Sequence, residues 1–200
     1  MRMKKTLLIL ALVLTACTAA PVTPPPAETL SSYNYAPLGL SFQYSKDWIF
    51  VKVGGPYNEF ADTTKGEDPF VRLQLPQETY PGTNFGNADL GLSAVPLESL
   101  EDCLNYVSSN PQSIFNINES TEINGLTYYA SLSTGAAAGN IYDSRNYRTY
   151  QNQVCFSVAE TLHTTNIGNY DPGTVTAVDE DEVWVRLDAI LQTVSFDSVH

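Results

Sequence analysis

Basic residues are scarce in this chain: 10 Lys and Arg stand against 22 Asp and Glu in 200 residues, which gives a formal net charge of −12. Binding to nucleic-acid phosphates requires clustered Lys and Arg, so the composition argues against nucleic acid as a partner. The hydrophobic fraction of 43% is too high for an intrinsically disordered chain. The length predicts a single main domain that can bury a core of its own.

Histidine is also scarce, with two residues in the chain, although it is the side chain most often used as an acid or base near neutral pH. His200 is the last residue, and His163 falls at the end of a predicted strand, where we expect it to face solvent or cap the strand. The sequence contains no nucleophile elbow, zinc-binding helix, phosphate loop or calcium loop. We therefore expect a protein that is not an enzyme and that uses no cofactor or metal.

The sequence lacks a hydrophobic run of the roughly 20 residues that a membrane-spanning helix needs. Its apolar run Leu7–Leu14 follows three basic residues, as in a secretory signal peptide. The run ends in Leu14-Thr15-Ala16-Cys17, which resembles the lipobox of bacterial lipoproteins. The resemblance implies cleavage before Cys17 and acylation of this cysteine, so residues 1–16 are predicted to be a signal peptide. The alternative is an ordinary cleavable signal with an incidental cysteine.

A lipidated Cys17 implies a location at a membrane surface, because two or more acyl chains anchor a protein stably. Thr18 follows the cysteine where an Asp would suggest retention in the inner membrane. We therefore expect the outer membrane if the source is diderm, and otherwise the outer face of the plasma membrane. Loss of the three basic residues of the signal leaves 7 Lys and Arg against 22 acids, a net charge of −15. Because anionic lipid repels such a domain, membrane lipid is expected as a partner only through Cys17.

Residues 17–32 contain four of the 12 prolines and are predicted to form a semi-rigid spacer, because proline favours the polyproline II conformation. Residues 33–200 are predicted to form the one globular domain. Within this domain, alternation of apolar and polar residues predicts strands. These strands are expected at 38–44, 48–53, 70–75, 88–92, 121–123, 126–132, 142–150 and 154–163, with a short one at 193–196.

Asn124-Gly125 is the strongest hairpin signal in the chain, because both central residues of a type I′ turn need a positive φ. Residues 135–139 are expected to form a flexible connection before a second hairpin around 151–153. Apolar residues at helical spacing predict an amphipathic helix of about three turns over 97–107. A second helix is predicted after Asp179, which resembles the first residue of a capping box. The predicted class is α+β, an antiparallel β-sheet flanked by helices in a single domain.

Four segments resemble PsbP-like domains, namely Gly39–Tyr44, Asp47-Trp48, Ile123–Gly125 and the ending Ala189–Phe196. The resemblance covers about residues 33–196 and implies an α/β/α sandwich around an antiparallel sheet. Many members of this family are bacterial lipoproteins of unknown role, and the best-known member is a non-enzymatic extrinsic subunit of a photosynthetic membrane complex. Ser45 stands where the family usually has proline, so the first turn is expected to be looser.

Cys103 and Cys155 remain as an even pair once Cys17 is assigned to lipid, and the predicted compartment is oxidising. A disulfide between them would join the first helix to the sheet and stabilise the fold by roughly 4 kcal/mol in the chain-entropy model. Two buried free thiols are the alternative. A Cys155 nucleophile with His163 as its base is excluded, because eight residues along one strand span roughly 26 Å. A pair of Cys103 and His163 remains open.

Arg145 and Arg148 are two of the seven cations of the mature chain and lie in a predicted strand rich in tyrosine. Because Arg and Tyr are enriched at recognition sites, a candidate ligand site comprises Arg145, Tyr147, Arg148 and Tyr170. Alternation puts Arg145 and Tyr147 on one face of the strand and Arg148 on the other. The alternative is that the arginines pair across the sheet with acids such as Glu160.

Three functions follow as hypotheses. The favoured one is a non-enzymatic, lipid-anchored envelope protein whose domain binds an envelope protein partner or stabilises an assembly. The second is a binder of a small anionic solute or of cell-wall glycan through the candidate ligand site. The third is a hydrolase with an unrecognised site, and the lack of any catalytic motif makes it the least favoured.

Overall fold

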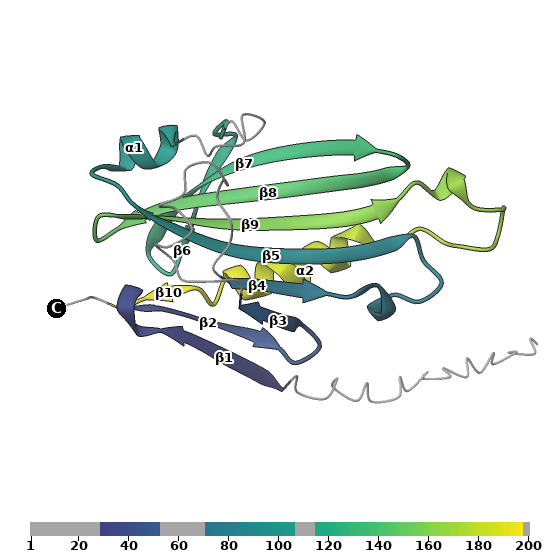
Figure 1. The fold of residues 1–200 in the computed structure, drawn as a ribbon, viewed down its shortest axis with the longest axis horizontal. Coiled ribbons are helices and arrows are strands. Elements are labelled where there is room, and N and C mark those ends of the chain that lie inside the picture. The colour runs from purple at the N-terminus through teal and green to yellow at the C-terminus, as the bar shows by residue number, and fades with distance from the viewer. Residues whose placement is uncertain (1–28, 53–70, 107–114, 198–200) are drawn as a thin grey trace, which may run out of the picture.

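The structure, a computed structural model, describes residues 29–52, 71–106 and 115–197 (Figure 1). The predicted signal peptide and Cys17 lie outside the described residues. The first strand begins at Leu30, inside the last residues predicted for the spacer. In the described part of the chain, no helix is long and apolar enough to cross a membrane.

Seven antiparallel strands form the main sheet, in the order β3-β4-β5-β9-β8-β7-β6 (Figure 1). In this order their bounds are β3 (Ile49–Lys52), β4 (Val71–Leu75), β5 (Phe85–Pro96), β9 (Val154–Thr165), β8 (Asn140–Gln151), β7 (Leu126–Ala137) and β6 (Glu119–Ile123). Apolar side chains at alternate positions form the core, and Leu73, Leu90, Val158 and Leu162 are completely buried. The alternation that predicted the strands is thus the pattern that buries one face of the sheet.

Three further strands form a small second sheet, in the order β1-β2-β10. They are β1 (Leu30–Tyr35), β2 (Leu40–Ser45) and β10 (Ser195–Phe196), and three short 3-10 turns lie at Ala36–Leu38, Gln77–Thr79 and Ile167–Asn169. The ring of Phe196 packs against that of Phe156 in β9, with centroids 4.3 Å apart. This contact joins the small sheet to the main one, and the predicted strand near the C-terminus is confirmed.

The C-terminal helix α2 (Glu180–Leu191) packs against one face of the main sheet and lies behind β5 and β9 in Figure 1. Asp179 is its N-cap as predicted, because its carboxylate accepts a hydrogen bond from the backbone N–H of Glu182 at 3.3 Å. The buried side of the helix includes Trp184 and Leu187. Burial of this amphipathic stripe, rather than helix propensity, is the main source of stability for a helix of this length.

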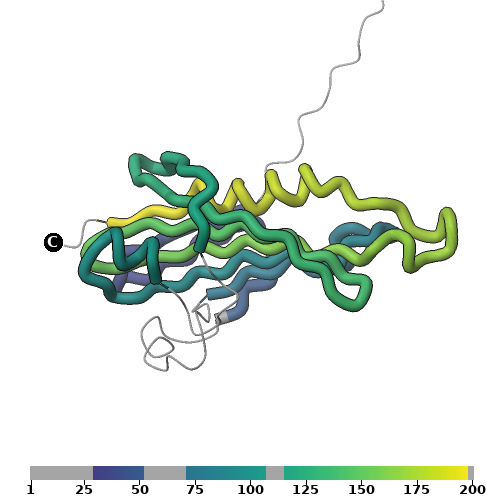
Figure 2. The backbone as a smooth tube through the Cα atoms, turned by 90° about the horizontal axis from the view of Figure 1, so that it is seen from above, coloured from purple at the N-terminus to yellow at the C-terminus, as the bar shows by residue number. Residues whose placement is uncertain are grey.

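The short helix α1 (Leu100–Asn105) packs against β8, and Figure 2 shows it on the face opposite to α2. It has six residues, fewer than the predicted three turns, because Cys103 is its one buried side chain and so little apolar surface supports a longer helix. Ser99 caps it by accepting a hydrogen bond from the N–H of Asp102 at 3.1 Å. A disulfide joins Cys103 to Cys155, with the two Cα atoms 5.3 Å apart, as predicted. Helices on both faces of an antiparallel sheet confirm the α+β class.

Two-residue turns connect β6 to β7 and β7 to β8. Asn124 and Gly125 have φ angles of 52° and 78°, which confirms the predicted type I′ hairpin between β6 and β7. The prediction of a flexible connection over 135–139 is wrong, because β7 continues to Ala137. Ala138 and Gly139 have φ angles of 49° and 80° and close a second tight hairpin, which lets β7 and β8 pair to their ends. The end of β7 was missed because its small residues show no alternation of apolar and polar side chains.

Candidate functional site

The structure separates the two arginines of the predicted ligand site. In β8, Arg145 lies opposite Glu160 of β9, and Arg148 lies opposite Ser157. Because neighbouring residues in a strand point to opposite faces, Arg145 and Tyr147 face α2, whereas Arg148 faces α1. The structure therefore brings Arg145 and Tyr147 together and keeps Arg148 apart from them.

Arg148 is buried, with 3% of its surface exposed. Its Nη1 donates to the carbonyl oxygens of Cys103 at 2.9 Å and of Tyr106 at 2.8 Å, and its guanidinium lies over the ring of Phe115 at 4.4 Å. These carbonyl groups belong to the C-terminal end of α1, where a positive charge is favourable. Arg148 therefore attaches α1 to the sheet, and this structural role accounts for its burial.

Tyr170 lies in the loop after β9, and its hydroxyl group is 2.7 Å from Oγ1 of Thr165. It does not line the pocket that contains Arg145. In the same loop, the side-chain amide of Asn169 donates to the carbonyl oxygen of Gly139 at 3.2 Å. The loop is thus tied to the turn between β7 and β8 rather than to the pocket.

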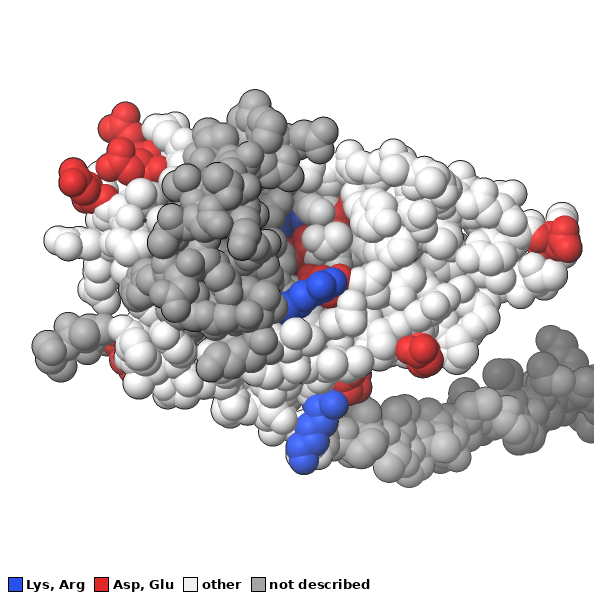
Figure 3. All heavy atoms as spheres, in the orientation of Figure 1, with Lys and Arg blue, Asp and Glu red and all other residues white. Residues whose placement is uncertain are grey.

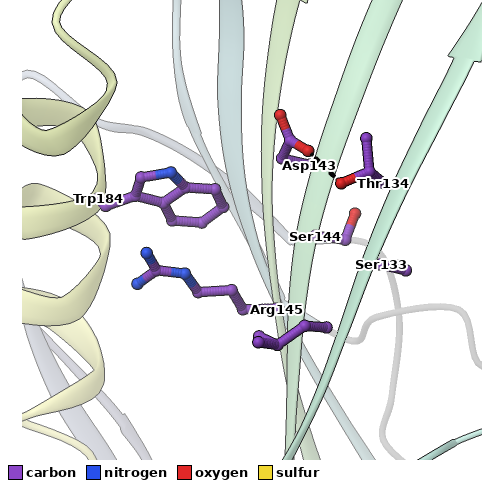
Figure 4. Close-up of a pocket in the computed structure, with 7 residues that line it drawn as sticks. Ser133, Thr134, Asp143, Ser144, Arg145 and Trp184 are labelled. Carbon is purple, nitrogen blue, oxygen red and sulfur yellow. Dashed lines mark hydrogen bonds between the residues drawn. The ribbon is translucent and has the colours of Figure 1, made fainter. Parts of the chain in front are cut away.

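A pocket of about 370 Å³ lies between β7, β8 and α2, as Figure 4 shows. The guanidinium of Arg145 lies over the ring of Trp184, 4.0 Å from its centroid, and the Nη1 atom is 3.4 Å from Oδ2 of Asp188. On the opposite wall, the hydroxyl of Thr134 donates to Oδ1 of Asp143 at 2.6 Å. The pocket therefore combines an aromatic ring, a paired cation and strand hydroxyl groups.

Glu160 lies next to Arg145 in the sheet and is completely buried. Neither of its carboxylate oxygens has a hydrogen-bond partner among the described residues. Burial and, to a smaller extent, the charge of Asp188 raise the pKa of Glu160 to about 8, although Arg145 opposes this shift. Burial also raises the pKa of the adjacent Tyr147 to about 12, helped by Glu160 and Asp188. Near neutral pH the acid is therefore mostly neutral, which avoids the cost of a buried charge.

From the sequence, Glu160 was expected only as a counterion of the arginines, although one signal pointed to its burial. Glu160 shares its face of β9 with Phe156, Val158 and Leu162, all of which are buried. An acid at an inward-facing position of a strand is unusual and is a candidate for a functional or tightly packed site. The acid whose charge it feels, Asp188, comes from α2, and no local pattern in the sequence predicts that proximity.

The outer edge of β7 borders the same pocket. β6 pairs with β7 only as far as Ala130, and the side-chain oxygen of Asn118 accepts a hydrogen bond from the N–H of Leu132 at 2.8 Å. From 133 to 137, β7 has no strand on its outer side within the described ranges, and all of these residues are exposed. In Figure 1 this segment forms the upper edge of the sheet.

The register shows which backbone groups this edge offers. Ala137 and Asn140 flank the two-residue turn and pair with each other, so their N–H and C=O groups are directed to one another. In an antiparallel ladder these groups alternate in direction, and those of Thr134 and Ala136 therefore point away from β8. Edge strands usually avoid further pairing by carrying charged side chains or proline. This segment has neither.

The pocket is lined by one cation, one acid, an aromatic ring and hydroxyl groups. The guanidinium of Arg145, the indole ring of Trp184, the carboxylate of Asp143 and hydroxyl groups line it, whereas His163 belongs to the other face of β9 by alternation. Nowhere in the described part of the chain do three or more His, Cys, Asp or Glu side chains form a group that could hold a metal ion. We therefore treat the pocket and the adjacent edge of β7 as one candidate binding site.

Comparison with known proteins identifies the fold. No model of a protein family matches the chain, and no curated protein matches it. Among solved structures, cyanobacterial PsbP (CyanoP) from Synechocystis sp. PCC 6803 is similar at 15% identity and a TM-score of 0.52, over 89% of this chain and 98% of that protein. The chain has the PsbP-like fold.

Two other solved structures are similar at lower scores. LpqN of Mycobacterium tuberculosis, which is involved in cell envelope biogenesis, matches at 9% identity and a TM-score of 0.43, over 90% of each chain. A protein of Bacteroides thetaiotaomicron matches at 12% identity and a TM-score of 0.45, over 80% of this chain and 46% of that one. At such identities a PsbP-like fold says nothing of a shared activity.

Proposed function

We propose that the protein is a lipid-anchored component of a bacterial cell envelope, and that its PsbP-like domain binds an extended segment of a partner protein. The location rests on the Leu14–Cys17 motif and on the proline-rich spacer that follows it. The spacer extends by up to about 3.1 Å per residue in the polyproline II conformation, which gives a tethered domain reach to other envelope proteins. The domain serves recognition or assembly and not catalysis.

The observation that carries the binding function is the open edge of β7. An extended peptide that lies along 133–137 gains main-chain hydrogen bonds from the outward groups of Thr134 and Ala136. Alternate side chains of such a peptide point to the face of the sheet where Arg145 and Trp184 line the pocket. Strand addition thus explains why the open edge and the pocket lie side by side.

The charge around the site indicates the chemistry of the partner. Asp143 lines the pocket beside the edge. Burial and, to a smaller extent, the charges of Asp143 and Asp181 raise the pKa of Glu180 at the start of α2, so these acids lie near one another. The only basic lining residue, Arg145, is already paired with Asp188. A partner segment with Lys or Arg at alternate positions therefore complements this site, and an acidic segment does not.

Crosslinking in intact membranes tests the proposal. A photoreactive amino acid at Ala136 of the full chain is expected to give one discrete adduct, whereas the same group at Glu119, on the neighbouring β6, is expected to give none. Mass spectrometry then identifies the partner and the segment of it that is bound. Adducts at both positions, or at neither, would contradict strand addition at β7.

Binding of the identified partner to two variants of one residue gives the sharper test. Ala136→Pro removes the outward N–H and places a ring at the edge, so the affinity is expected to fall about tenfold or more. Ala136→Ser keeps the N–H and is expected to bind normally. An equal affinity for both variants, with both folded by circular dichroism, would show that the partner binds elsewhere.

A further inference from the structure

A second hollow, of about 480 Å³, lies on the face of the main sheet that α2 does not cover. Residues of β4, β5, β8 and β9 line it, and none of them also lines the pocket beside β7. Figure 3 shows this face of the molecule. Few charged side chains lie over the ends of β5, β8 and β9 on the right of this view. The hollow is therefore a separate feature from the candidate binding site.

Small residues form the floor of this polar hollow. In the register of the sheet, Gly91 of β5 lies opposite Ala159 of β9, and the hydroxyl-bearing Thr161 lies one step along the same face. The longer side chains of Arg72 and Tyr142 stand on either side, on β4 and β8. This contrast in size makes the surface concave at a place where larger side chains would otherwise fill it.

A continuous chain of polar side chains borders the hollow. Arg72 donates through Nε to Oδ1 of Asp89 at 2.8 Å, and the amide of Asn87 donates to the other carboxylate oxygen. The Oδ1 atom of Asn87 is 2.8 Å from Nδ1 of His163, whose Nε2 is 2.9 Å from Oδ1 of Asn140. Because each side chain is held by the next, the remaining donors and acceptors of the chain are fixed in direction before any ligand arrives.

Tyr142 and His163 form the aromatic end of the hollow. Their rings are stacked, with centroids 4.6 Å apart and an angle of 11° between the planes, and 40% of Tyr142 remains exposed. Gly86 makes room for the imidazole, since a Cβ atom at that position would be 2.4 Å from Nδ1 of His163. Any side chain at position 86 would therefore displace this histidine.

We propose that the polar hollow binds a neutral saccharide. Sugar hydroxyl groups both donate and accept hydrogen bonds, and adjacent hydroxyls match the paired atoms of planar groups such as the amide of Asn87 and the carboxylate of Asp89. The apolar face of a pyranose ring packs on an exposed aromatic ring, and Tyr142 offers one. A few convergent polar groups in a concave site with an aromatic wall are typical of a small-molecule site.

Charge and polarity disfavour other ligands. The charge of Arg72 is balanced by Asp89 in an ion pair, and a chain with a net charge of −12 repels anions. Asn87 and Thr161 each have side-chain partners in the sheet, but an apolar ligand would bury their remaining donor and acceptor capacity unused, which is costly. A neutral ligand rich in hydroxyl groups avoids both penalties.

Titration calorimetry tests the proposal on the full chain, purified in a detergent without a sugar headgroup. The probes are chitotetraose, cellotetraose and maltotetraose, with inorganic phosphate as the anionic probe. We expect at least one tetrasaccharide to bind and Tyr142→Ala to weaken it about five- to tenfold, the usual worth of an aromatic contact. Thr161→Val, which keeps the shape of the floor and removes a hydroxyl group, is expected to weaken it as well.

Tyr170→Ala is the matched control, because Tyr170 is also an exposed tyrosine but does not line the hollow. This variant is expected to bind the tetrasaccharide with unchanged affinity. Binding of phosphate alone, binding of none of the probes, or an affinity that is unchanged in both Tyr142→Ala and Thr161→Val would overturn the proposal.

Discussion

Nη1 of Arg148 in β8 donates a hydrogen bond at 2.9 Å to the carbonyl oxygen of Cys103, the same residue whose sulfur is bonded to Cys155 in β9. Two adjacent strands thus hold one residue of α1 from its side chain and from its backbone. A helix of six residues is too short to be stable by itself. These two attachments explain how α1 persists on a face of the sheet that it covers only in part.

Arg148 is therefore expected to matter for stability more than for ligand binding. Arg148→Ala removes charge-assisted hydrogen bonds to one buried and one partly buried carbonyl oxygen and is expected to lower the free energy of unfolding by on the order of 3 kcal/mol, measured by urea titration. Arg72→Ala is the matched control, since its partly exposed ion pair with Asp89 is worth about 1 kcal/mol or less. Equal losses in the two variants would contradict this assignment.

Removing the disulfide is expected to have a comparable effect. The two cysteines are 52 residues apart in sequence, and a cross-link over such a loop contributes roughly 4 kcal/mol in the chain-entropy model. The double variant Cys103→Ala/Cys155→Ala should therefore unfold at a lower urea concentration, while the far-UV circular dichroism of the sheet is retained. A variant as stable as the parent would mean that Arg148 alone suffices to hold α1.

Local signals in the sequence were enough to place most elements. Asn124-Gly125 predicts its turn because the two positive φ angles depend on those two residues alone, and Asp179 caps α2 through an N–H only three residues away. Residues 135–137 carry no such signal, because small side chains show no alternation. Propensity and spacing therefore predicted both helices and the order of the strands from β2 onward, but not β1, which begins inside the predicted spacer, nor how far β7 extends.

The sites depend on register, which the sequence does not contain. Asn87 and His163 are 76 residues apart and meet only because β5 and β9 pair in one register. Trp184 reaches Arg145 only because α2 crosses that part of the sheet. His163 was expected to face solvent or cap a strand, and its hydrogen bonds to two amide side chains could not be inferred from its neighbours in sequence.

Glu160 predicts a dependence of stability on pH. Its pKa is raised from 4.5 to about 8 in the folded protein, so the folded state holds the proton more tightly than the unfolded state. Below about pH 4.5 both states are protonated and no penalty exists. As the pH rises from 4.5 to 8, the unfolded state ionises first and stability falls, and above pH 8 the penalty stays constant at on the order of 5 kcal/mol.

Glu160→Gln removes this titration and keeps the shape of the side chain. The gain in free energy of unfolding relative to the parent should be several kcal/mol larger at pH 8 than at pH 5, as measured by urea titration at both pH values. Glu119→Gln, at an exposed position of β6, should show no such difference. A difference between Glu160→Gln and the parent that is the same at both pH values would show that Glu160 is ionised in the folded state throughout.

The lipid anchor is predicted to depend on Cys17 alone. Cys17→Ser is expected to abolish incorporation of radiolabelled fatty acid and to move the protein from the membrane fraction to the soluble fraction, because an acidic domain has no electrostatic attraction to anionic lipid. Thr18→Ser is the control and is expected to remain acylated. Retention of the Cys17→Ser chain in washed membranes would point to anchoring by an uncleaved signal or by a partner.

Gly86 leaves free the space that the imidazole of His163 occupies. In Gly86→Ala the new methyl carbon would stand 2.4 Å from Nδ1 and 2.7 Å from Cε1 of the imidazole, so the ring must leave its place between Asn87 and Tyr142. Such overpacking is expected to cost about 1–3 kcal/mol of stability, and the affinity for any tetrasaccharide bound by the parent is expected to fall about tenfold.

The double variant Gly86→Ala/His163→Ala separates the two effects, because it removes the clash together with the ring. Urea titration should show most of the lost stability restored, while calorimetry should show that the affinity is not, since the aromatic end of the hollow is then incomplete. If Gly86 served the backbone rather than the ring, for example at the register irregularity between Phe85 and Asn87, the double variant would stay as unstable as Gly86→Ala. The stability of the double variant therefore decides whether this glycine is present to seat His163.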